Sequence, residues 1–532
     1  MTRRELVAGA GLALAQTSAV QGQGRRGSGK QPGTPRPNIL MLMADQLRFD
    51  CLGAYGNKVI QTPNIDRLAR EGVRFDCAYS STPTCTPARA ALLTGLSPWH
   101  HGMLAYSDIA EKYRQEKPRM LAEAGYQTTA IGKNHFYPMR NSHGYQQMLL
   151  DEHCSYWKPG ESGNKSEASP EARCDYEAWF WQQNPLGDPH ATGLSWNDYR
   201  AKPFAMPEKL HATTWTGDAA VNYLTQYDRE QPFFLKVSFI RPHSPYDPPE
   251  RLMRKYRGAA IPEARAAAWA KKFEPRSGPD NEIWHGKLPA AEVRQSREGY
   301  YASVEFVDEQ VGRILAALEK RGMLEETLIV FFSDHGDMLG DHNLWRKSYP
   351  WEESARIPMV MRWPEGLVAG KRGVVRKEPV ELRDILPTFL EAAGTKPELP
   401  VDGKSLLQLA AGNVAGWREW IDLEHSICYS PANNWNALCD GKVKYIYSAF
   451  DGAEQLFDLA TDPGELRDLA GNPAHAATLA LWRERLVAHL SERGERYVKD
   501  GKLVARPKGV LTAPHFPGWP EYPHRPGLQG RI

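Results

Sequence analysis

The chain has 532 residues, enough to bury a large core and, beyond about 300 residues, to divide into more than one domain. Its 66 lysines and arginines nearly balance 64 aspartates and glutamates, for a formal net charge of +2. This balance gives no reason to expect nucleic acid or an anionic membrane as a partner. Beyond the N-terminal segment no run reaches the ~18 apolar residues of a membrane span. We therefore expect a soluble mature protein whose partner binds at a local site.

Residues 1–35 have the layout of an export signal followed by a linker. Arg3 and Arg4 precede a short stretch of small and apolar residues that ends near Ala15, and polar residues follow up to Pro37. Paired arginines before a weakly apolar stretch favour the twin-arginine route, with ordinary secretion or a disordered tail as alternatives. The mature protein is therefore expected in the periplasm or outside a bacterial cell.

Apolar runs of strand length alternate with helical patterns through residues 36–412, which we interpret as the catalytic domain. One helix is predicted from Thr62-Pro63 to Gly72, and another from Tyr301 to Lys320. The alternation predicts an α/β fold with a large mixed, mostly parallel sheet sandwiched by helices. The expected strands are Asn38–Met43, Thr128–Ile131, Phe233–Ile240, Leu328–Phe332 and Met359–Met361.

Residues 413–532 are predicted to form a small α+β domain and a tail. Short strands are expected at Val443–Tyr447 and Gln455–Asp458, and a helix at Thr478–Glu492. Between the predicted strands, residues 139–206 and 246–295 lack periodicity, as in binding loops or loosely ordered insertions. The first of these stretches contains tryptophans that either stack on a sugar or pack in the interior: Trp157, Trp179, Trp181 and Trp196.

Metal-binding and acid–base residue types follow four of the predicted strands. In parallel α/β sheets, sites form beyond the carboxyl ends of the strands. A single aspartate after a strand is more often a helix cap than a ligand, but four such strand ends together favour a common site. The residues are Asp45-Gln46, then Lys133 and His135, then His243, and finally Asp334-His335.

Four of these residues are suited to hold a divalent cation. Asp45 and Asp334 offer carboxylates, Gln46 an amide oxygen and His335 an imidazole. A set of mostly oxygen donors favours Ca2+, while the nitrogen donor of His335 leaves Mn2+ and Mg2+ as alternative ions. Two carboxylates neutralise the cation and leave room for an anionic substrate.

Cys85 is expected at the start of a short helix that ends at Gly95. There the exposed amides and the helix dipole favour anions, although a buried structural cysteine is the alternative. Seven cysteines in an oxidising compartment leave one thiol outside any pairing of the other six, and Cys85 is our candidate. Sequence proximity suggests the pairs Cys428 with Cys439 and Cys154 with Cys174, although spacing does not establish connectivity.

The pentapeptide Cys85-Thr86-Pro87-Ala88-Arg89 resembles the Cys-x-Pro-Ser-Arg signature of the formylglycine-dependent sulfatases, in the alkaline phosphatase superfamily. Ala88 departs from the usual serine, and Gln46 and His335 stand where many members have Asp and Asn. This variant pattern also resembles choline sulfatases and phosphonate monoester hydrolases. The resemblance spans roughly residues 37 to 470, and the other segments that carry it are Asp45-Gln46-Leu47-Arg48, Thr62 to Ala69, Gly132-Lys133-Asn134-His135, Pro242-His243, Ser333 to Asp337, Trp345-Arg346-Lys347, Leu456 to Leu459 and Asp462-Pro463.

The resemblance implies a sulfatase that cleaves sulfate esters of sugars or aryl alcohols with a divalent metal. A formylglycine-generating enzyme would oxidise Cys85, and the hydrated aldehyde would share the metal with its ligands and attack sulfur, giving a covalent sulfate intermediate. Arg89 would hold the nucleophile, and Lys133 and Lys347 would bind the sulfate oxygens. His243 would protonate the leaving oxygen and His135 would act on the diol, or the reverse.

Two other functions remain open at this point. A phosphonate monoester hydrolase or phosphodiesterase of the same superfamily is one, because a phosphodiester carries about the same charge as a sulfate monoester. The other is a secreted protein that binds sulfated glycans through an unmodified site. The intact set of metal, cation and histidine positions argues against mere binding.

Overall fold

The structure is a computed structural model that describes residues 36–152, 174–279 and 281–519. Within these residues eight strands form one central sheet, in the order β5-β4-β6-β1-β7-β8-β2-β9. The five strands from β5 to β7 are parallel, whereas β8 runs antiparallel to both of its neighbours. The strands are β1 Asn38–Asp45, β2 Val73–Phe75, β4 Gln127–Gly132, β5 Gln147–Leu150, β6 Phe233–Pro242, β7 Thr327–Ser333, β8 Met359–Arg362 and β9 Val374–Arg376. The predicted mixed, mostly parallel sheet is confirmed.

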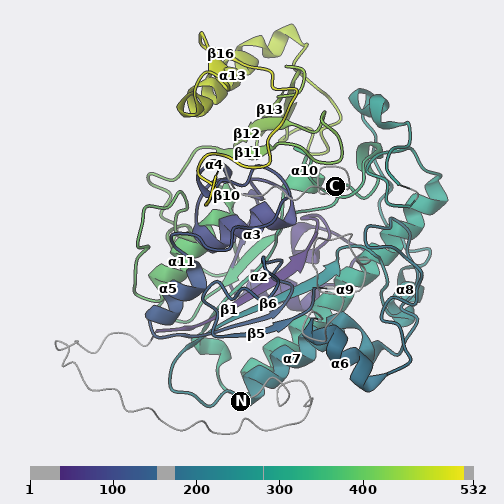
Figure 1. The fold of residues 1–532 in the computed structure, drawn as a ribbon, viewed down its shortest axis with the longest axis vertical. Coiled ribbons are helices and arrows are strands. Elements are labelled where there is room, and N and C mark those ends of the chain that lie inside the picture. Colours follow the sequence, from purple (N-terminus) through teal and green to yellow (C-terminus); the bar gives the residue numbers. More distant parts are fainter. Residues whose placement is uncertain (1–35, 153–173, 280, 520–532) are drawn as a thin grey trace, which may run out of the picture.

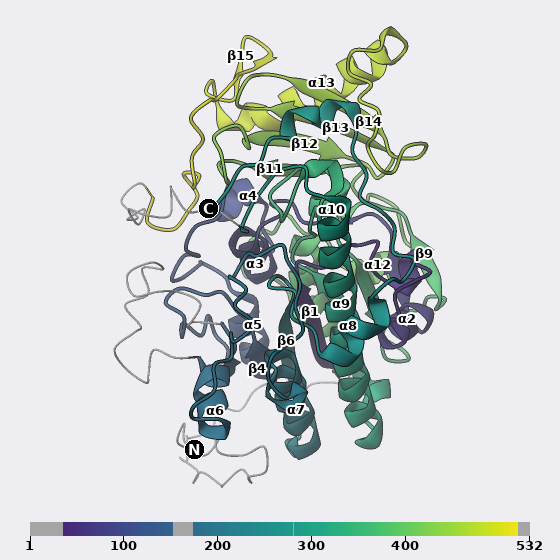
Figure 2. The ribbon, with the colours of Figure 1, turned by 90° about the vertical axis from the view of Figure 1, so that its right-hand side faces the viewer.

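The central strand β1 shows how the sequence divides the core into two layers. Ile39, Met41 and Met43 face one apolar layer, and Leu40 and Leu42 face the other, because alternate side chains of a strand point to opposite faces. Helices cover both faces (Figures 1 and 2). The first layer packs against α3 Cys85–Thr94, α5 Lys117–Glu123, α11 Ile385–Ala392 and α12 Leu406–Ala410, and the second against α2 Pro63–Arg70, α7 Ala212–Gln226, α8 Glu250–Tyr256 and α9 Ala290–Lys320.

Helix α9 begins eleven residues before its predicted start at Tyr301. The added turns bury polar side chains such as Ser296 and Arg297, and therefore lack the apolar stripe that sequence periodicity detects. Arg297 donates to the carbonyl oxygens of Leu339 and Pro262, which fixes the loop after β7 against this helix. The remaining short elements are α4 Pro98–His101, α6 Asp175–Gln183, α10 Glu352–Ala355, β3 Ala78–Tyr79, β10 Val380–Glu381, β15 Val498–Lys499 and β16 Lys502–Leu503.

The C-terminal part forms an antiparallel sheet with a helix packed against it. Its strands are β11 Ile421–His425, β12 Trp435–Cys439, β13 Val443–Ser448 and β14 Glu454–Asp458, and the helix is α13 Ala476–Leu490. This sheet lies beyond the carboxyl ends of the central strands (Figure 2). The predicted α+β character is confirmed, and β11 and β12 are strands that the sequence analysis did not identify.

The predicted disulfide between Cys428 and Cys439 is wrong, because both are free, buried thiols. Cys428 lies in the loop before β12 and Cys439 ends that strand. An extended strand advances about 3.4 Å per residue, so β12 separates the two sulfur atoms despite their short spacing in sequence. For the second predicted pair, Cys154 lies outside the described residues. Among the helices that are described, none is long and apolar enough to cross a membrane.

Candidate active site

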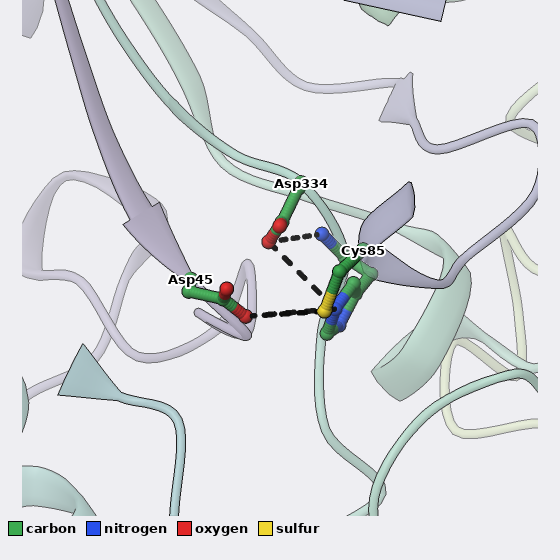
Figure 3. Close-up of side chains that lie close together, drawn as sticks. Asp45, Cys85 and Asp334 are labelled. Carbon is green, nitrogen blue, oxygen red and sulfur yellow. Dashed lines mark hydrogen bonds and ion pairs between the residues drawn. The ribbon is translucent and has the colours of Figure 1, made fainter. Parts of the chain in front are cut away.

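Four side chains from three segments converge beyond the carboxyl end of the central sheet. Asp45 ends β1, Cys85 begins α3, and Asp334 and His335 follow β7. One potential ligand atom from each of the four lies within 4.8 Å of the other three, and all four residues are buried. Figure 3 shows the side chains of Asp45, Cys85 and Asp334 close together. The Cys85 Sγ is 3.7 Å from Asp45 Oδ1 and 3.1 Å from His335 Nε2. This donor set fits a divalent cation that accepts oxygen and nitrogen ligands.

The position of Cys85 follows from the local sequence around α3. Thr84 is extended, with φ −153° and ψ 145°, and the helix ends at Gly95, whose φ of 73° favours glycine. Every residue of α3 is buried, and its several alanines allow close packing against the neighbouring elements. Cys85 is therefore held at the positive end of a rigid helix, where a developing negative charge is stabilised.

Arg89 and Lys133 place two positive charges beside the carboxylates. The Arg89 Nη2 donates to Asp45 Oδ2 at 3.1 Å and to Asp334 Oδ2 at 3.0 Å. The Lys133 Nζ lies 2.6 Å from Asp45 Oδ2 and 3.9 Å from Cys85 Sγ. Burial by itself raises the pKa of Asp45, but Lys133 and the other cationic groups around it hold that pKa well below its usual value.

The same charges act on Cys85. Burial and the nearby Asp45 raise the pKa of its thiol, while Lys133, Lys347 and His335 lower it, and the net result is a pKa below the usual value for cysteine. The position therefore favours a negatively charged atom at the end of side chain 85.

Gln46 and Lys347 connect the cluster to the neighbouring loops. The Gln46 backbone N–H donates to Asp334 Oδ1 at 3.2 Å, and its side-chain Nε2 donates to Asp337 Oδ2 at 2.6 Å. Its Oε1 accepts from Lys347 Nζ at 2.8 Å. The amide that the sequence analysis assigns to the cation thus lies beside the cluster, with its oxygen held by Lys347.

His243 lies between Lys347 and an aromatic ring. Its Nε2 is 2.8 Å from Lys347 Nζ and its Nδ1 is 2.7 Å from the carbonyl oxygen of Ser244. The ring of Trp196 stacks on it with centroids 4.6 Å apart, and Lys133 Nζ lies 5.3 Å from the same Trp196 ring. Burial, followed by the charges of Lys347 and Lys133, holds the pKa of His243 well below its usual value, so the ring is neutral.

His135 occupies the loop after β4. Its Nε2 lies 3.1 Å from the Tyr106 hydroxyl, and its backbone N–H donates to Glu152 Oε1 at 2.9 Å, which supports a φ of 57°. Burial, together with the charge of Lys133, also lowers the pKa of His135 well below its usual value.

The comparisons with known proteins decide the family. Residues 37–395 match the protein family described as Sulfatase, and residues 340–492 match the one described as N-sulphoglucosamine sulphohydrolase, C-terminal. The chain belongs to the sulfatase family. This sulfatase is 37% identical over 484 residues to an arylsulfatase of Clostridium perfringens, with 90% of the chain and 100% of that protein covered. It is therefore a sulfuric ester hydrolase, and not a protein that only binds sulfated glycans.

Two further comparisons concern the two groups of enzymes that the variant pattern resembles. The sulfatase is 31% identical over 477 residues to a choline-sulfatase of Rhizobium meliloti, covering 86% of the chain and 87% of that protein. The crystal structure of a phosphonate monoester hydrolase of Agrobacterium radiobacter superposes with a TM-score of 0.69 at 27% identity, covering 88% of the chain and 100% of that structure. The alkaline phosphatase-like fold is thereby confirmed.

Hydrogen bonds and ion pairs join nine of the ten predicted site residues of this sulfatase, and the tenth, His135, lies close enough for the charge of Lys133 to lower its pKa, while the role of each stays a prediction. Of the four tryptophans for which stacking on a sugar or interior packing was left open, Trp196 contacts His243, Trp179 and Trp181 lie on α6 and pack against an apolar cluster, and Trp157 lies outside the described residues. Tyr106, whose hydroxyl contacts His135, was not predicted as a site residue, because it follows no predicted strand and belongs to no motif.

Proposed function

We propose that this sulfatase hydrolyses sulfate esters through a formylglycine made from Cys85, which shares a divalent cation with Asp45 and Asp334. The observation that carries the proposal is the buried cluster in which Cys85 Sγ, the two carboxylates and the imidazole of His335 lie within 4.8 Å of one another. Members of the family generally use a metal and a formylglycine, which supports both assignments.

The cation would be held by Asp45, Asp334 and His335, with Gln46 as a further oxygen donor. It would supply positive charge that favours ionisation of the nucleophile and offsets charge on the substrate. Ca2+ is the ion that this mostly oxygen-donor set favours, with Mn2+ and Mg2+ as alternatives. Arg89 already bridges both carboxylates, so it would keep them oriented while the cation is bound.

Lys133 and Lys347 would bind the sulfate oxygens. Both ammonium groups are buried beside the nucleophile, where fixed charges stabilise a transition state more strongly than in water. Each already has a polar acceptor, Asp45 for Lys133 and Gln46 Oε1 for Lys347, which fixes its position before substrate binds.

His243 would deliver a proton to the leaving oxygen. In the described arrangement its Nδ1–H donates to Ser244 O, so its Nε2 accepts from the Lys347 ammonium. For His243 to act as this acid, Lys347 must first pass a proton to its Nε2, which then delivers that proton to the leaving oxygen as the ester S–O bond breaks. His135, in contact with Tyr106, would act on the hydrated aldehyde.

The substrate class we propose is an aryl sulfate or a sulfated carbohydrate. The arylsulfatase relative and the half-buried Trp196 beside His243 support a ring on the leaving group. Gln46 and His335 favour one competing activity, the phosphonate monoester hydrolase reaction. A kcat/KM higher for an aryl phosphonate than for the matching aryl sulfate would reverse our assignment.

The proposal has two further parts. Residues 1–35 would direct export to the periplasm or beyond, and a formylglycine-generating enzyme would mature the protein. Fractionation of a bacterial culture that expresses the full chain would test the location. Retention in the cytoplasm would contradict it.

The direct test is sulfate release by protein produced together with the maturing enzyme. Cys85→Ala should abolish release from 4-nitrophenyl sulfate and from a panel of sulfated sugars. Cys439→Ala provides a matched control, since it removes a buried free thiol from the C-terminal sheet. Equal activity of Cys85→Ala and Cys439→Ala would refute the proposal.

A further inference from the structure

A buried hydrogen-bonded group joins the nucleophile, the Lys347 loop and the C-terminal sheet. Thr84 directly precedes Cys85, and Ser348 directly follows Lys347. The Thr84 Oγ1 lies 2.7 Å from Ser348 Oγ and 2.7 Å from His425 Nε2. All three side chains are at most 1% exposed, so water does not compete for these bonds.

The C-terminal sheet makes a second contact with the same loop. Trp435 is the cross-strand partner of His425, and its Nε1 donates to the carbonyl oxygen of Ser348 at 3.0 Å. The Ser348 N–H donates to Pro83 O at 2.9 Å, one residue before Thr84. Two neighbouring side chains of one β-ladder thus bind the two segments that carry Cys85 and Lys347.

The Lys347 loop needs such support because its backbone is strained. Arg346 and Ser348, on either side of Lys347, have φ of 67° and 77°, values that non-glycine residues rarely adopt. Conformations of this kind persist where surrounding contacts determine them. Here those contacts come from Asp337, which accepts from the Arg346 N–H at 3.0 Å, and from Pro83, Thr84 and Trp435 around Ser348.

We propose that His425 is a positioning residue, which sets the alignment of side chain 85 relative to Lys347 through Thr84 and Ser348. This inference rests on the proposed function, in which those two side chains act on one sulfate group. His425 contacts neither of them and acts through the hydroxyl groups between. Burial lowers its pKa to about 3, so it stays neutral and serves as a fixed hydrogen-bond partner instead of a proton carrier.

The consequence for catalysis is geometric. A displacement of about 1 Å between reacting groups can cost a factor of ~100 in rate, so loss of the His425 contact should lower kcat. Substrate binding relies on the positive charges of Lys133 and Lys347, which are retained when His425 is replaced. We therefore expect His425→Ala to reduce kcat by roughly 10- to 100-fold with KM changed less than about 3-fold, and His425→Gln to recover part of the loss because its amide is also a hydrogen-bond partner.

A double-mutant cycle distinguishes positioning from general destabilisation. Thr84→Val removes the shared hydroxyl, so adding His425→Ala to it should cause little further loss of kcat. Leu438→Ala is the matched control: Leu438 is buried in the same sheet but packs with α13, and its truncation should lower stability while kcat of the folded enzyme is unchanged.

Three results would overturn the inference. They are wild-type kcat in His425→Ala, a kcat loss that is additive with that of Thr84→Val, and a kcat loss of the same size in Leu438→Ala. In every variant, peptide mass spectrometry should report the same conversion of Cys85. If wild-type sulfate release does not depend on Cys85, the proposed function fails; if it does and His425→Ala is fully active, this inference fails alone.

Discussion

Lys117 is buried in the apolar layer between the sheet and α11, without a carboxylate partner among the described residues. It is 1% exposed, and its Nζ lies 3.3 Å from Met41 Sδ and 5.8 and 5.3 Å from the ring centroids of Phe234 and Phe389. Burial lowers its pKa from 10.5 to about 7. Replacing it by methionine removes the ionisable group and keeps a side chain of similar length.

The size of the effect follows from the two pKa values. Each tenfold change in proton affinity is worth about 1.4 kcal/mol, so a fall from 10.5 to about 7 corresponds to about 5 kcal/mol of destabilisation. The unfolded chain binds more protons than the folded one between pH 7 and 10.5. The destabilisation is therefore complete below pH 7, shrinks to about 2 kcal/mol at pH 9, and vanishes above 10.5.

Lys117→Met should thus stabilise the protein by several kcal/mol at pH 6.5 and by much less at pH 9. Urea unfolding at both pH values, followed by tryptophan fluorescence, gives the two differences in free energy of unfolding. Lys112→Met removes the same charge from an exposed position and controls for net charge. A Lys117→Met variant that is no more stable than wild type, or whose gain is independent of pH, would refute the reasoning.

Three further predictions concern the C-terminal interface and the active site. Lys444 is fully buried between Glu352 at 2.7 Å and Glu465 at 3.0 Å, and its charge holds the pKa of Glu352 below the usual value, so Lys444→Met should cost about 3–5 kcal/mol of stability in urea unfolding, and adding Glu352→Gln should recover part of it. No rescue by Glu352→Gln would show that charge is not the cause. Dialysis against a chelator should abolish sulfate release and lower Tm, with both restored by Ca2+; activity that survives complete metal removal, checked by elemental analysis, would exclude a required cation. Trp196→Ala should lower kcat/KM for an aryl sulfate by roughly tenfold, whereas Trp181→Ala should not; equal effects would indicate a role in folding alone.

The strand ends were predictable because apolar runs identify strands, and parallel strands bring their carboxyl ends to one edge of the sheet. Asp45, Lys133, His243 and Asp334 were found by this rule alone. The resemblance to the sulfatase signature added Arg89 and Lys347, which no periodicity marks, and gave Cys85, already singled out as the unpaired thiol at a helix start, its role as the nucleophile.

What the sequence did not predict depends on contacts between distant segments. The first turns of α9 bury polar groups such as Arg297, whose carbonyl partners lie far away in the chain. The separation of Cys428 from Cys439 depends on β12, a strand that was not recognised. Thr84, Ser348 and His425 meet only after the C-terminal sheet docks on the catalytic domain, so their spacing in sequence carries no signal.

The most direct test is a crystal structure of the matured protein with Mn2+, using anomalous scattering to locate the ion. One strong peak should lie within bonding distance of Asp45, Asp334, His335 and an oxygen on an oxidised side chain 85. A peak away from these residues, or an unmodified Cys85 thiol in protein that releases sulfate, would contradict the shared cation and the formylglycine nucleophile.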